Sequence, residues 1–200
     1  MITAREVSYG LFGAWRLAHL DRRGMEYFDT SIDGFWRSFW AAALMAPPYA
    51  LFLVLKFARQ EVDLDPLRFI LVEMIAYAIL WTAFPLAAWY LVAALGKTNR
   101  YFGYIIACNW ANIIQIAVML PVFALVAGSG LPGGVARTIW FAVIVAALFY
   151  QYFIARVALE VDMPVAAGFV FLDFVLSFLR EAIVIALEFP PGSQPVSPFG

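Results

Sequence analysis

Long apolar runs fill the chain between Phe35 and Leu187, and short charged or glycine-rich joints separate them. The hydrocarbon core of a bilayer is about 30 Å thick, so a helix needs about 20 apolar residues to cross it. The pattern therefore predicts an all-α fold class, a polytopic transmembrane helical bundle of five spans within residues 35–188. The expected spans are Phe35–Phe57, Ile75–Leu95, Phe102–Ala127, Thr138–Ala158 and Pro164–Leu187.

Residues 1–34 form an N-terminal arm with a different pattern. Val7, Leu11 and Ala18 recur at helical spacing, while most of the charged residues fall on other faces. One interpretation is an amphipathic helix in the cytoplasmic membrane interface, with Trp15 as its aromatic anchor. The other is a helix packed under the bundle, and the sequence leaves both open.

Local signals mark both edges of the transmembrane domain. Thr30-Ser-Ile-Asp33 has capping-box spacing and predicts the start of the first span, with Thr30 as N-cap. The proline-rich tail, residues 189–200, carries no positive charge and is expected to be extended.

Composition supports the membrane interpretation and excludes one class of partner. Hydrophobic residues make up 64% of the chain and charged residues 14%, against about 25% charged in a soluble domain. A soluble fold of this length could not bury so much apolar surface in one core. The net charge is −1 and no basic stripe stands out, which argues against a nucleic-acid partner.

The distribution of Lys and Arg predicts an orientation, because these residues are enriched in cytoplasmic segments. With the N-terminus inside, the cytoplasmic segments hold eight of them and the opposite side holds four. The eight are Arg5, Arg16, Arg22, Arg23, Arg37, Lys97, Arg100 and Arg156, and the four are Lys56, Arg59, Arg68 and Arg137. We therefore expect a cytoplasmic N-terminus and a C-terminus on the opposite side.

Six polar residues inside the third and fifth spans form a candidate intramembrane polar cluster. They are Asn109, Asn112, Gln115, Asp173, Ser177 and Arg180. Their spacings place those of each span on one helical face. They either make interhelical hydrogen bonds that fix packing or line a hydrophilic groove for a ligand or a proton path.

Two carboxylates carry more specific expectations. Asp173 lies near the middle of its span and is expected to accept hydrogen bonds from Asn109 and Asn112. Glu73 is expected at the outer interface, because the apolar run from Leu67 to Leu95 is longer than one span needs.

Catalytic and metal-binding patterns are missing from the sequence. The chain has one histidine, His19, and one cysteine, Cys108, which is interpreted as a small buried hydrophobic residue. Metalloprotease, nucleophile-elbow and Walker A motifs do not occur. We therefore expect no catalytic residue, no metal site and no cofactor, and a protein that is not an enzyme.

Four short segments resemble the Yip family of five-span membrane proteins, particularly its bacterial relatives. They are Phe35-Trp-Arg-Ser-Phe-Trp40, Ala46-Pro-Pro48, Cys108-Asn-Trp110 and Phe171-Leu-Asp-Phe174. The resemblance implies a non-enzymatic helical bundle that acts in membrane organisation, trafficking or complex assembly. It implies the bacterial inner membrane as the location, and the orientation expected from Lys and Arg then makes the C-terminus periplasmic.

Two functions follow from these observations. The first is a scaffold, assembly factor or accessory subunit that contacts other membrane subunits, or copies of itself, through its helices in the lipid bilayer. The second is a small transporter or channel with a polar path through the third and fifth spans. They differ in whether the polar side chains converge on a cavity or close on one another.

Overall fold

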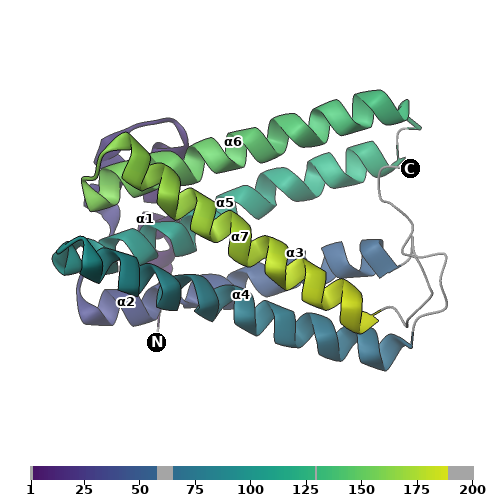
Figure 1. Cartoon of the computed structure of the whole chain (residues 1–200), viewed down its shortest axis with the longest axis horizontal. Helices are drawn as coiled ribbons and strands as arrows, with labels where there is room; N and C mark the ends of the chain where they lie inside the picture. Colours follow the sequence, from purple (N-terminus) through teal and green to yellow (C-terminus); the bar gives the residue numbers. More distant parts are fainter. Residues whose placement is uncertain (1, 58–64, 129, 189–200) are drawn as a thin grey trace.

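A computed structural model describes residues 2–57, 65–128 and 130–188, and the described parts contain helices and short joints without strands (Figure 1). The fold is therefore all-α, as predicted. The α-helices are α1 (Ala4–Ala18), α2 (Ile32–Ser38), α3 (Trp40–Phe57), α4 (Pro66–Ala94), α5 (Tyr101–Gly128), α6 (Gly133–Leu159) and α7 (Met163–Glu188). Two 3₁₀ helices, η1 (Arg22–Tyr27) and η2 (Thr98–Arg100), join α1 to α2 and α4 to α5. The predicted extended tail, 189–200, lies outside the described residues.

Four helical segments are long and apolar enough to cross a membrane. They are Ile32–Leu55, Pro66–Ala94, Thr98–Val126 and Gly133–Leu159. They overlap the first four predicted runs, although the second begins nine residues before the predicted Ile75. α7 coincides with the fifth predicted run but is not one of these four segments. Together these helices identify the chain as an integral membrane protein built as a helical bundle.

The N-cap of the first run differs from the predicted one. Ser31, not Thr30, is the N-cap, and its hydroxyl accepts a hydrogen bond from the Gly34 N–H at 3.0 Å. The Asp29 carboxylate accepts from the Ser31 N–H at 3.1 Å, forming an Asx turn that starts the helix one residue later. The run is also divided at Phe39 into α2 and α3.

The N-terminal arm packs under the bundle, against α5 and α6. Ala14 and Leu17 are fully buried, and the Tyr150 hydroxyl donates to the Ala14 carbonyl at 2.6 Å. The opposite face of α1 remains exposed, with Trp15 51% accessible. Figure 1 shows α1 and α2 at the same end of the bundle as the α4–α5 and α6–α7 joints.

The best-packed part of the molecule lies where α1 packs on α5 and α6, α2 packs on α5, and α7 packs on α6. Ile105, Ile154 and Phe169 are buried there, each at most 1% exposed. Large apolar side chains such as Leu86 and Phe141 remain more than 60% exposed on the outside of the long helices. An inside-out distribution of this kind is typical of helices that face lipid.

Candidate functional site: a polar cavity in the helical bundle

Five of the six predicted site residues converge on one cavity of about 320 Å³. Asn109 lies eight residues from the start of α5, about 12 Å along its axis, and Asp173 lies ten residues from the start of α7, about 15 Å along. Both helices begin at the same end of the bundle (Figure 1), so these depths match. The converging residues are Asn109, Asn112, Gln115, Asp173 and Ser177.

Asn109 is held by a partner that the sequence analysis did not identify. Its amide nitrogen donates to the Ser38 hydroxyl at 2.9 Å, and Ser38 in turn donates to the Phe35 carbonyl at 2.7 Å. Asn109 and Ser38 are both at least 97% buried. Within the described residues, the Asn109 amide bonds Ser38 of α2 and not Asp173 of α7, so the expected hydrogen bond from Asn109 to Asp173 is not formed.

Several polar groups face the cavity without a partner in the protein. Within the described residues, the Gln115 Nε2 and Trp81 Nε1 atoms are buried and have no hydrogen-bond acceptor, and no hydrogen bond joins Asp173 to Asn109 or Asn112. Buried donors normally find partners, because an unmade hydrogen bond costs about 1–3 kcal/mol. The cavity can thus offer both donors and a carboxylate to a polar molecule.

Gln151 of α6 also lines the cavity, and the sequence analysis missed it. The available signal was a lone amide inside the mostly apolar fourth run. Apolar side chains complete the wall, among them Trp81 and Phe84 of α4 and Cys108 of α5. Cys108 is buried, as predicted.

Arg180, the sixth predicted residue, does not line this cavity but joins a separate charged cluster formed by α3, α4 and α7. The Tyr49 hydroxyl donates to Glu73 Oε2 at 2.9 Å and accepts from Arg180 Nη1 at 3.3 Å. Arg180 Nη1 lies 3.9 Å from Glu73 Oε2, and Arg180 Nη2 donates to Glu181 at 2.8 Å. The Glu73 side chain, expected at the outer interface, is buried between helices.

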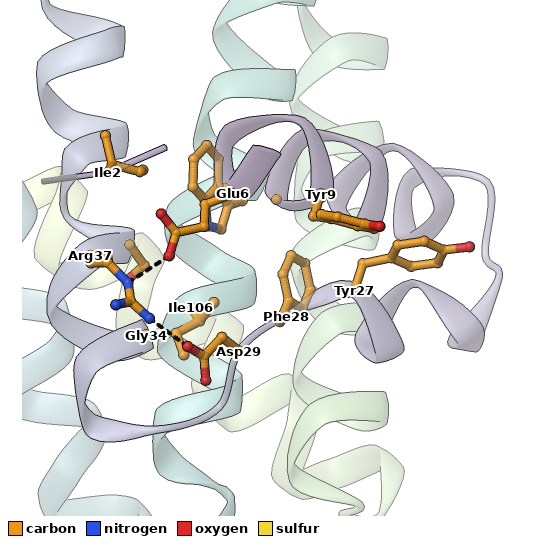
Figure 2. A pocket seen from close by; sticks show the side chains of 12 residues that line it. Ile2, Glu6, Tyr9, Tyr27, Phe28, Asp29, Gly34, Arg37 and Ile106 are labelled. Carbon is orange, nitrogen blue, oxygen red and sulfur yellow. Dashed lines mark hydrogen bonds and ion pairs between the residues drawn. The ribbon is translucent and has the colours of Figure 1, made fainter. Parts of the chain in front are cut away.

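A smaller cavity of about 180 Å³ lies between α1 and α2 (Figure 2). Arg37 spans it, with Nε 2.9 Å from Glu6 Oε1 and Nη2 2.6 Å from Asp29 Oδ2. Ser38 lines this cavity and Asn109 lines the larger one. The hydrogen bond between Ser38 and Asn109 thus joins a residue of one cavity to a residue of the other.

Acidification is expected to loosen α1 from α2. Hydrogen bonds from the backbone and hydroxyl of Thr3, with the Arg37 charge, lower the pKa of Glu6. Hydrogen bonds from Ser31, with the Arg37 ion pair, lower the pKa of Asp29. Carboxyls with lowered pKa values stabilise the folded state above their ordinary pKa, about 4, and lose that contribution as the pH falls through the lowered pKa. We therefore expect the α1 amides to lose protection against hydrogen exchange, relative to the intrinsic exchange rate at each pH, below about pH 4.

Matched variants separate this effect from general acid unfolding. Glu6→Gln should reduce the pH dependence of the α1 protection factors. Glu26→Gln, at an exposed glutamate of η1, should leave that dependence unchanged. Protection factors in α1 that are equal at pH 7 and pH 3, measured by mass spectrometry and corrected for the intrinsic exchange rate, would contradict the expectation.

The fold and the site together define a class, a helical integral membrane protein with a polar cavity between its long helices. Among the described residues, no group of three or more His, Cys, Asp or Glu side chains could hold a metal ion. No family model, no curated protein and no solved structure matches the chain.

Proposed function

We propose that the chain has five membrane spans, with α7 as the fifth, and that the end carrying α1 faces the cytoplasm of a bacterial cell. α7 has 26 residues, about 39 Å, which exceeds the thickness of a bilayer core. The α1 end carries Arg22, Arg37, Lys97, Arg100 and Arg156, and this supports the orientation by the positive-inside rule. The exposed Trp15 supports an interfacial location for α1. The Yip-family resemblance predicts the same topology.

Within that topology, we propose that the protein binds a small polar solute in the cavity and acts as a small transporter or channel. The observation that carries this proposal is the convergence of Asn109, Asn112, Gln115, Asp173 and Ser177 on one cavity. Polar residues that served only to fix packing would instead bond one another. A volume of about 320 Å³ lies at the lower end of the range for small-molecule sites.

Asp173 is the residue proposed to define the ligand. Ionisable groups at this depth are costly in lipid and mark substrate or ion pathways. A carboxylate among amides and an indole N–H suits a cation or a solute rich in hydroxyl or amide groups. No catalytic step is needed, so a non-enzymatic role remains our proposal.

Cysteine accessibility tests whether the cavity is reached from water. In a Cys108→Ala background, Ser177→Cys should react with a membrane-impermeant methanethiosulfonate reagent in proteoliposomes. Phe178→Cys is the matched control, because Phe178 is adjacent on α7 and 65% exposed on the apolar surface. Labelling of Ser177→Cys at least about tenfold faster supports an aqueous site, since thiolates form in water and not in lipid. Equal rates at the two positions would contradict it.

Solute flux tests the transport step directly. Proteoliposomes should be challenged with glycerol, urea and a proton gradient, and Asp173→Asn should reduce the supported flux by about tenfold or more, the effect of losing a hydrogen bond to a charged group. Ser8→Ala on the exposed N-terminal arm is the control. Unchanged flux in Asp173→Asn, or no flux of any probe through the parent protein, would count against the proposal.

A second candidate function is the scaffold or accessory subunit. A groove of about 350 Å³ between α5 and α6 supports it, because Ala142 and Ala146 line it at a four-residue spacing that permits close helix approach in lipid. Purification in mild detergent would reveal a stoichiometric partner or a second copy. Ala146→Leu should disrupt that complex, and a complex that survives the change would contradict this use of the groove.

A further inference from the structure

A third cavity lies at the α1 end of the bundle and is distinct from the polar cavity. Its volume is about 490 Å³, and three arginines from three separate elements line it: Arg22 of η1, Arg100 of η2 and Arg156 of α6. Two carboxylates, Glu160 and Asp162, lie in the α6–α7 joint on the same wall. Charges therefore gather here from parts of the chain that are far apart in sequence.

One of the two carboxylates is already engaged. Arg100 Nη2 lies 2.7 Å from Glu160 Oε2, and Lys97 Nζ donates to the Glu160 carbonyl at 3.0 Å. Glu160 has φ 51°, a left-handed conformation that a non-glycine residue adopts only when its surroundings hold it. The two cations of the α4–α5 joint thus fix the α6–α7 turn and neutralise Glu160.

Arg22 and Arg156, unlike Arg100 and Lys97, do not bond Glu160. Within the part of the chain that the structure describes, neither forms an ion pair or a side-chain hydrogen bond. The lining groups carry three positive and two negative charges, a net of +1, and Lys97 beside Glu160 raises this to +2. A partly enclosed pocket with two uncommitted guanidinium groups attracts anions.

We propose that this pocket binds a phosphate group, carried either by an anionic lipid headgroup or by a free phosphate. The planar guanidinium fork matches phosphate oxygens and forms paired charge-assisted hydrogen bonds with them. The pocket opens at the end of the bundle with the larger number of cations, where anionic headgroups are found if that end faces the cytoplasm. The inference does not depend on what the polar cavity carries.

The test compares two double variants that remove the same charge. Arg22→Gln/Arg156→Gln empties the pocket of its uncommitted cations, and Arg68→Gln/Arg137→Gln removes two exposed arginines at the opposite end. The probes are phosphatidylglycerol and phosphatidylcholine, titrated into detergent-purified protein and counted by native mass spectrometry, and inorganic phosphate, followed by calorimetry. Circular dichroism verifies the helix content, and the single variants Arg22→Gln and Arg156→Gln carry the test if the double variant unfolds.

The outcomes separate the two sources of phosphate. Preference for phosphatidylglycerol over phosphatidylcholine that weakens by about 10- to 30-fold in Arg22→Gln/Arg156→Gln alone supports a lipid headgroup, since each basic residue contributes about 1 kcal/mol near an anionic surface. Binding of inorganic phosphate with the same variant dependence, and no lipid preference, supports a free phosphate. Equal weakening in both double variants, or no binding of any anionic probe by the parent protein, overturns the proposal.

Discussion

Replacing Gly34 with alanine is expected to lower the free energy of unfolding by about 3 kcal/mol or more, because it forces overpacking against backbone. A Cβ atom at Gly34 would lie 1.9 Å from the Asp29 carbonyl oxygen and 2.8 Å from the Asp29 Cγ atom. The Asp29 backbone cannot move away without disturbing the Asx turn to Ser31 and the ion pair to Arg37. The substitution should therefore disrupt the junction of η1 and α2 and loosen α1.

Gly168→Ala is the matched control for this prediction. Gly168 also lies in a helix, α7, but a Cβ atom there would meet nothing within 4 Å. Alanine should therefore stabilise the protein by about 0.5–1 kcal/mol through helix propensity alone. Chemical unfolding in detergent, followed by circular dichroism, measures both changes. Similar changes in the free energy of unfolding at the two glycines would contradict the prediction.

Helix positions were predictable because a long apolar run has few alternatives to a helix in lipid. α5 begins and ends within one residue of the predicted 102–127, and α7 within one residue of the predicted 164–187. The predicted N-cap of α2 was wrong by one residue, because the hydroxyls of the adjacent Thr30 and Ser31 can both cap a helix. The neighbouring Asp29 decides between them by bonding the Ser31 N–H, and spacing alone does not reveal that bond.

Helical periodicity also predicted which polar residues share a face, and these include five of the residues that line the cavity. Periodicity could not reveal the partners that depend on packing between distant elements. Ser38 and Asn109 bond across 71 residues of sequence, and Arg37 connects Glu6 to Asp29. Because such contacts depend on crossing angles and rotations of whole helices, the sequence could name the polar residues without assigning their roles.

The contacts of Arg180 also depend on packing between helices and could not be read from the sequence. A substitution of Arg180 is the second change for which we expect a large effect. Arg180→Leu should lower the free energy of unfolding by about 3 kcal/mol, because removing one partner of a buried ion pair costs about that much. The change removes a cation 3.9 Å from the buried Glu73 carboxylate and the donor to the Tyr49 hydroxyl at 3.3 Å. Arg137→Leu, at an exposed arginine of α6 in the same half of the bundle, is the control and should change stability by less than about 0.5 kcal/mol.

A double-mutant cycle distinguishes loss of charge compensation from loss of packing. Glu73→Leu removes the carboxylate that Arg180 helps to neutralise, so Glu73→Leu/Arg180→Leu should be more stable than the sum of the single changes predicts. Buried ion pairs replaced together by apolar groups are often neutral or stabilising, and this holds more strongly when the surroundings are lipid. Strictly additive effects in the cycle would mean that Arg180 and Glu73 do not compensate each other's charge.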